Sequence, residues 1–151
     1  MKIVYCGDIV GRSGRDVVLK NLKTIQEKYT PDVIVVNAEN AAHGFGLTPG
    51  ICRDFFAAGV DAITTGNHVY DQREIIPFLD DCKKIVRPLN FPEGNVGRGI
   101  CEIELAGGKK LLVAQVMGRA FMEDLDCPVQ ALEKVLKSYI MGANISAILV
   151  D

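Results

Sequence analysis

The sequence has no strong charge bias and no apolar run long enough to cross a membrane. Its 151 residues carry 17 Lys and Arg against 19 Asp and Glu, a formal net charge of −2. Such a balance does not indicate nucleic-acid binding. The longest apolar stretches, residues 33–36 and 145–150, are far shorter than the roughly 20 residues of a membrane-spanning helix, so we expect no membrane segment.

The sequence also lacks the marks of secretion and of cysteine-based sites. It begins with a strand-like run, residues 1–5, instead of the apolar core and cleavage site of a secretory signal, so we expect a cytoplasmic protein. The cysteines are odd in number, widely spaced and never arranged as Cys-x-x-Cys, which argues against a zinc ribbon or a disulfide framework. We interpret them as small buried apolar residues: Cys6, Cys52, Cys82, Cys101 and Cys127.

The first half of the chain alternates strand-like and helix-like patterns. The predicted strands are residues 2–7, 33–36 and 61–65. The predicted helices are one carrying Val17, Val18, Leu22 and Ile25 after a loop over 8–15, one that starts at Thr48-Pro49 and ends at Gly59, and one over 74–82. Strands and helices in this order predict an α/β fold with a mostly parallel or mixed sheet flanked by helices.

The second half of the chain has a different pattern of predicted strands and helices. Residues 100–105 and 110–116 read as a hairpin around 106–109, followed by a helix over 129–141 and a last strand over 145–150. The chain stops directly after that strand, where an α/β protein usually carries a functional loop. We therefore expect residues 1–151 to form a single domain that is the N-terminal portion of a longer one.

Three polar clusters follow the first three strands. They are Gly7-Asp8, Asn37-Ala38-Glu39-Asn40 and Gly66-Asn67-His68. Carboxyl ends of parallel strands meet at one edge of a sheet, so the clusters should converge on one crevice. Carboxylate, amide oxygen and imidazole are ligands for Mg²⁺, Mn²⁺, Fe²⁺ or Zn²⁺, and Asp8 or Glu39 could bridge a pair of such ions. A phosphoester is the natural substrate of a paired site.

Ordinary structural roles compete with this interpretation. Asp8 could cap the following helix, and Asn40 or Asn67 could belong to simple turns. Arg12 and Arg15 could grip a phosphate, although we favour surface ion pairs. The spacing of Gly7, Gly11 and Gly14 is not the Gly-x-Gly-x-x-Gly fingerprint, yet a nucleotide-cofactor-binding α/β module stays an alternative.

The clusters and their flanks resemble the YmdB-like branch of the calcineurin-like metallophosphoesterases. The matching segments are KIVYCGDIVGR at 2–12, NAENAA at 37–42 with GFG at 44–46, and GNH at 66–68 followed by Asp71. The resemblance covers all 151 residues. It implies an incomplete α/β/β/α sandwich and a phosphodiesterase acting on small phosphoesters, with cyclic nucleotides, including 2′,3′-cyclic ones, as the substrate class.

The resemblance also implies roles for individual residues. Asp8, Glu39, Asn40 and Asn67 would bind two divalent ions, iron or manganese with magnesium or zinc as alternatives, and Glu39 would bridge them. His68 would act as general acid or charge stabiliser. Phe45 and His43, in the loop that follows Asn40, are candidate substrate contacts. A homo-oligomer and an RNA-related partner stay open, although the charge does not favour RNA.

Two departures from the family pattern matter. Val10 stands where the broader superfamily has the histidine of Asp-x-His, which suits this branch. Members of the branch complete the site with histidines from later loops, which these 151 residues do not contain. Four protein ligands would hold two ions weakly, so we expect this chain alone to be weakly active or inactive. A non-catalytic protein that binds or senses a phosphorylated ligand is the other alternative.

Overall fold

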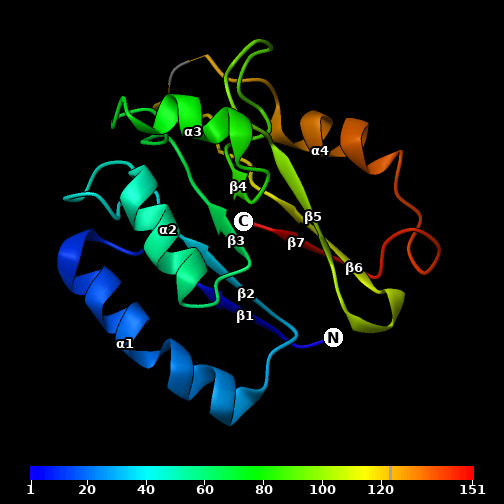
Figure 1. Ribbon diagram of the computed structural model, residues 1–151. Coiled ribbons are helices and arrows are strands. Elements are labelled where there is room, and N and C mark those ends of the chain that lie inside the picture. The colour runs from blue at the N-terminus through cyan, green and yellow to red at the C-terminus, as the bar shows by residue number, and fades with distance from the viewer. Residues whose placement is uncertain (123) are drawn as a thin grey trace.

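The computed structural model describes residues 1–122 and 124–151 and contains two β-sheets that pack face to face (Figure 1). The first sheet is parallel, in the order β1-β2-β3-β4, with strands Ile3–Cys6, Val33–Asn37, Ala62–Thr64 and Ile85–Val86. In the second, β5 (Ile100–Glu104) pairs antiparallel with β6 (Lys110–Ala114), which pairs parallel with β7 (Ala147–Val150). The expected α/β class with parallel and mixed strands is confirmed.

Strand β2 separates two apolar cores. All five of its residues are buried. Ile34 and Val36 belong to the core beneath the helices, whereas Val33 and Val35 belong to the core between the sheets, with Leu111 and Val113 of β6. Successive side chains of a strand point to opposite faces, so an unbroken apolar run is what a strand covered on both faces requires.

Three helices cover the outer face of the parallel sheet: α1 (Gly11–Tyr29), α2 (Pro49–Ala57) and α3 (Ile75–Asp81) (Figure 1). Each contributes a fully or almost fully buried side chain to the helix-side core, namely Leu22, Phe55 and Leu79. The fourth helix, α4 (Pro128–Leu136), lies beyond β5 on the other side of the molecule (Figure 1). No helix in residues 1–122 and 124–151 has both the length and the apolar character that crossing a bilayer requires.

Two predicted boundaries are wrong. Helix α1 begins at Gly11, inside the loop expected over 8–15, because the Gly14 amide already bonds to the Val10 carbonyl at 3.1 Å. Helix α4 ends at Leu136 rather than 141. There the Asn144 side chain accepts from the Ile140 amide at 2.7 Å and donates to the Ser138 carbonyl at 2.9 Å, so it replaces helical bonding beyond the last turn.

Smaller differences concern the strands and the cysteines. The two-residue strand β4 gives too short an apolar pattern to be predicted, and β6 and β7 are shorter than the expected 110–116 and 145–150. Cys52 and Cys101 are buried as predicted, and burial raises the pKa of the Cys101 thiol to about 11. The remaining cysteines are only half-buried.

The predicted start of α2 is confirmed and can be tested. The Thr48 hydroxyl accepts from the Ile51 amide at 3.3 Å, Pro49 opens the helix, and Gly59 follows its end with φ of 97°. Thr48→Ala should lower the free energy of unfolding by about 1 kcal/mol because that amide loses its acceptor. Urea denaturation followed by circular dichroism measures the change. Thr48→Ser keeps the acceptor, so equal losses in both variants would contradict the capping role.

Candidate metal centre

Backbone hydrogen bonds join the loops that follow β1, β2 and β3. The Ile9 amide donates to the Asn37 carbonyl at 3.0 Å, and the Gly11 amide donates to the Asn40 carbonyl at 2.8 Å. One strand further, the Ala38 amide donates to the Thr64 carbonyl at 3.0 Å. The three polar clusters of the sequence are therefore held together at the carboxyl edge of the parallel sheet.

Asp8 lies at the exposed side of this edge. Its φ of 34° is in the left-handed region, which Asp tolerates better than most residues. The Asn40 Nδ2 donates to Asp8 Oδ1 at 2.7 Å, which orients the carboxylate. The N-cap of α1 is Val10, and no side chain caps that helix. The simple alternative, in which Asp8 caps the helix, is therefore wrong.

Glu39 occupies a hollow that only glycine permits. A Cβ built on Gly66 would lie 1.5 Å from Glu39 Oε2, so the carboxylate rests directly on that backbone. Burial raises the pKa of Glu39, and the nearby charges of Asp8 and Asp151 raise it further, whereas His68 and a hydrogen bond from the Asn67 amide oppose the rise. The Asn67 amide thus contacts Glu39, and the charges of Asp8 and Asp151 act on it, so the site concentrates negative charge.

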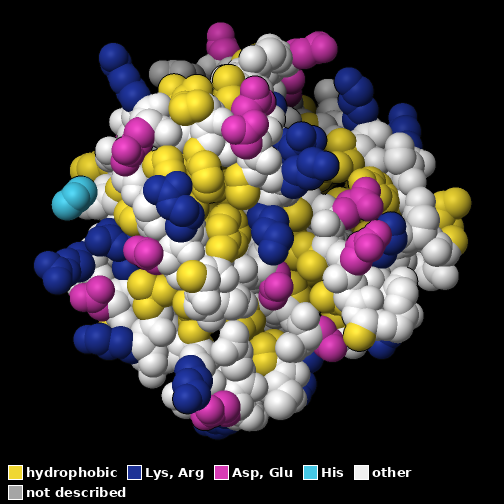
Figure 2. Space-filling view, viewed as in Figure 1, with side chains coloured by type: hydrophobic (Ala, Val, Ile, Leu, Met, Phe, Trp, Pro, Cys, Tyr) yellow, Lys and Arg dark blue, Asp and Glu magenta, His cyan; other side chains and the backbone are white. Residues whose placement is uncertain are grey.

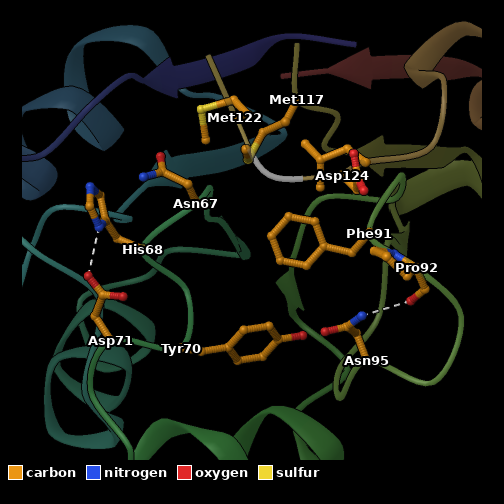
Figure 3. A pocket seen from close by; sticks show the side chains of 11 residues that line it. Asn67, His68, Tyr70, Asp71, Phe91, Pro92, Asn95, Met117, Met122 and Asp124 are labelled. Carbon is orange, nitrogen blue, oxygen red and sulfur yellow. Dashed lines mark hydrogen bonds and ion pairs between the residues drawn. The ribbon is translucent and has the colours of Figure 1, made fainter. Parts of the chain in front are cut away.

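His68 stands beside these oxygens with a fixed orientation. Its Nδ1 lies 2.7 Å from Asp71 Oδ2, which leaves Nε2 as the ring nitrogen directed away from that carboxylate (Figure 3). The Phe45 ring meets the His68 ring edge-on, with 5.1 Å between centroids. His43 is exposed, and within the described part of the chain it makes none of the contacts that join this group. Of the two candidate substrate contacts, only Phe45 adjoins the site.

The two arginines near the start of α1 have structural partners. Arg12 forms an exposed ion pair with Asp16 at 3.7 Å. Arg15 donates to the Ala41 carbonyl and so ties α1 to the loop after β2. The preference for surface pairing is confirmed for Arg12, whereas Arg15 is a loop anchor. Figure 2 shows one face of the molecule on which Lys and Arg side chains alternate with Asp and Glu, as expected for a chain with almost balanced charge.

A polar network under the site is the main feature that the sequence reasoning missed. Asp151 Oδ2 accepts from Asn37 Nδ2 at 2.8 Å and from the hydroxyl of the fully buried Thr64. Asn37 Oδ1 in turn accepts from the Glu39 amide at 3.1 Å. Burial and Asp151 both raise the pKa of Tyr5, which belongs to the same network. The signal for Asp151 was its place directly after an apolar strand, the same place that Asp8 has.

A pocket opens beside Asn67 and His68. Its volume is about 460 Å³, and its walls include Tyr70, Phe91 and Met117 (Figure 3). These side chains come from the loop after β3 and from the loops that precede β5 and follow β6. The pocket therefore joins the oxygen-rich centre to an aromatic surface.

The donor set fits a divalent cation. Asp8 and Glu39 are two carboxylates whose mutual repulsion a cation would relieve, and Asn40 and Asn67 supply amide oxygens of the kind that hard cations accept. In residues 1–122 and 124–151, no three His, Cys, Asp or Glu side chains form a cluster able to hold a metal on their own.

Comparison with known proteins gives consistent matches. The family model described as YmdB-like protein matches residues 4–151. The chain is 44% identical over 136 residues to the 2′,3′-cyclic-nucleotide 2′-phosphodiesterase of Bacillus subtilis, an alignment that covers 90% of the chain and 51% of that relative.

Solved structures agree with this match. A hypothetical protein from Thermus thermophilus superposes with a TM-score of 0.89 at 38% identity, over 99% of this chain and 56% of that one. A phosphatase from Mycoplasma pneumoniae superposes with a TM-score of 0.89 at 29% identity, over 100% of this chain and 54% of that one. The chain thus spans about half the length of the relatives it matches.

The network under the site predicts a stability effect. Asp151→Ala should lower the free energy of unfolding by roughly 1–3 kcal/mol, because the donors of Asn37 and Thr64 stay buried without their acceptor. Chemical denaturation measures the change. Asp80→Ala, at an exposed position of α3, is the control and should change stability by less than about 0.5 kcal/mol. Equal effects of the two substitutions would show that Asp151 does not stabilise the site.

Proposed function

The chain belongs to the YmdB-like protein family, and we propose that it forms the metal-binding part of a phosphodiesterase that acts on cyclic nucleotides. The observation that carries this proposal is the convergence of Asp8, Glu39, Asn40 and Asn67 around the Gly66 hollow, with His68 beside them. The activity named for the Bacillus subtilis relative supports 2′,3′-cyclic nucleotides as the substrate class.

The four oxygen-bearing side chains would hold two divalent ions, iron or manganese, with magnesium or zinc as alternatives. When bound, such ions lower the pKa of water and neutralise the charge on phosphoryl oxygens. Glu39 is the central ligand in this proposal because its carboxylate accepts from the Asn67 amide and also feels the charge of Asp8. Asn40 orients Asp8 through Nδ2, and its Oδ1 is the amide atom that a cation would bind.

His68 would supply the proton for the leaving oxygen. Asp71 contacts Nδ1, which fixes the ring and assigns proton transfer to Nε2. As the ester bond breaks, the proton on Nε2 moves to the departing alkoxide, and the ring is left neutral. Phe45 packs on the edge of the ring and restricts its rotation. His43 has no comparable contact, and we assign it no role.

Metal retention tests the Gly66 hollow. Gly66→Ala should displace the Glu39 carboxylate and abolish retention of Mn²⁺ or Fe²⁺, because the new Cβ takes the position of Oε2. Elemental analysis after metal loading and buffer exchange gives the ratio of metal to protein. Asp8→Ala should lose metal in the same way.

Gly118→Ala is the matched control for this experiment. Its Cβ would meet nothing within 4 Å, and neither Gly66 nor Gly118 has a positive φ that would penalise alanine. The Gly118 variant should keep the metal content of the unaltered chain. Full retention by Gly66→Ala would refute the proposed position of the metal ligands.

Leaving-group dependence tests the role of His68. His68→Gln should slow hydrolysis of 2′,3′-cyclic AMP by about 100-fold or more, because an alkoxide leaving group needs a proton. The same variant should slow bis(p-nitrophenyl) phosphate much less, since nitrophenolate departs unprotonated. Single-turnover assays with excess metal-loaded protein measure both rates even when turnover is weak. Equal slowing of the two substrates would assign His68 to charge stabilisation instead.

A further inference from the structure

The pocket beside His68 is larger than a phosphate group needs. Its volume of about 460 Å³ lies within the range of roughly 300–1,000 Å³ that is usual for small-molecule sites. Asn67 and His68 border it on one side, and Phe91 and Asn95 lie across from them (Figure 3). A ligand whose phosphate reaches Asn67 would therefore place its remaining atoms in this pocket.

Phe91 forms a wall that is supported from behind. It lines both this pocket and a neighbouring groove that residues of α4 also line. Arg87 lines only the groove, with its guanidinium carbon 6.0 Å from the centroid of the ring. The cation that packs against Phe91 thus belongs to a residue that does not line the pocket.

Tyr70 provides a second fixed ring. Its centroid lies 5.9 Å from that of Phe91, with the planes at 44°. The Tyr70 hydroxyl donates to the Val96 carbonyl at 2.7 Å, so the ring is anchored at its far end. Two inclined aromatic surfaces therefore line one part of the pocket.

The loops that carry these rings are held by buried and half-buried polar groups. Arg87 donates to the carbonyls of Pro88, Asn95 and Val96 at 2.7, 3.2 and 3.2 Å. The fully buried Asn90 bonds to both the amide and the carbonyl of Met117 at 2.9 Å, which fixes the opposite wall. Rigid apolar walls that do not close on one another are typical of a pre-formed ligand site.

We propose that this pocket binds the nucleobase of the substrate, with the pocket side of the Phe91 ring as the stacking surface. Aromatic rings and methionine sulfur contact the face of any base, and every base has such a face. Nucleobase binding here deepens the proposed phosphodiesterase function and rests on it for the position of the phosphate. The base, ribose and cyclic phosphate would then run from Phe91 towards Asn67.

Ligand binding tests the proposal without hydrolysis. Calorimetry compares adenosine 3′-monophosphate with ribose 5-phosphate, which lacks a base, on the 151-residue chain with and without Mn²⁺. The nucleotide should bind more tightly, and Phe91→Leu should weaken it by about 10-fold while ribose 5-phosphate is unaffected. Phe91→Tyr restores a ring and should restore binding.

A second phenylalanine variant controls for general loss of packing. Phe56→Leu replaces a half-buried ring of α2 that lies outside the pocket, and it should leave nucleotide binding unchanged. Equal affinity for the two ligands, no binding of the nucleotide, or no effect of Phe91→Leu would each overturn the nucleobase pocket. Nucleotide binding that depends on Phe91, together with full metal retention by Gly66→Ala, would support the pocket and refute the proposed metal centre of the phosphodiesterase.

Discussion

The burial of β2 on both faces is the constraint on which the site depends. Ile34 and Val36 face the helices, whereas Val33 and Val35 face the second sheet, so neither face of the strand is free. A slip of one residue would exchange the side chains between the two cores and would turn every following residue to the opposite side. The positions of Asn37, Glu39 and Asn40 are therefore fixed by apolar packing away from the polar atoms themselves.

That rigidity is needed because the site is electrostatically unfavourable without a cation. Glu39 is half-buried, and its pKa is raised by burial and by the charges of Asp8 and Asp151. Groups held in such surroundings lower stability and are typical of functional sites. Asn37 and Thr64 offset part of the repulsion by donating to Asp151, and His68 lies close enough to lower the pKa of Glu39. Neutral hydrogen-bond donors of the strands, rather than a salt bridge, thus stabilise the Asp151 carboxylate.

Local patterns predicted the parts of the structure that local chemistry determines. Thr48-Pro49 caps α2 as expected, and the polar residues after each strand meet at one edge because parallel strands share a direction. The Asp151 network and the pocket at Phe91 could not be predicted, because both join residues whose distance depends on how the two sheets pack. The end of α4 was missed for a similar reason, since the side-chain amide of Asn144, well beyond Leu136, competes with helical bonding. The contact of Glu39 with the Gly66 backbone could not be predicted either, because the two residues belong to different strand-end loops.

The oxygen-rich centre and the aromatic pocket are built by separate interactions. The centre is fixed by β2, Gly66 and the Asp151 network, whereas the pocket is fixed by Arg87 and Asn90, which bond to the loops before β5 and after β6. Asn67 and His68, in the loop after β3, line the pocket and also act on Glu39 in the oxygen-rich centre. Changes in the pocket loops can therefore alter the shape of the pocket without moving Glu39 or Asp8. A side chain at Gly66 would displace Glu39, whereas a change at Phe91 would leave the Glu39 hollow intact.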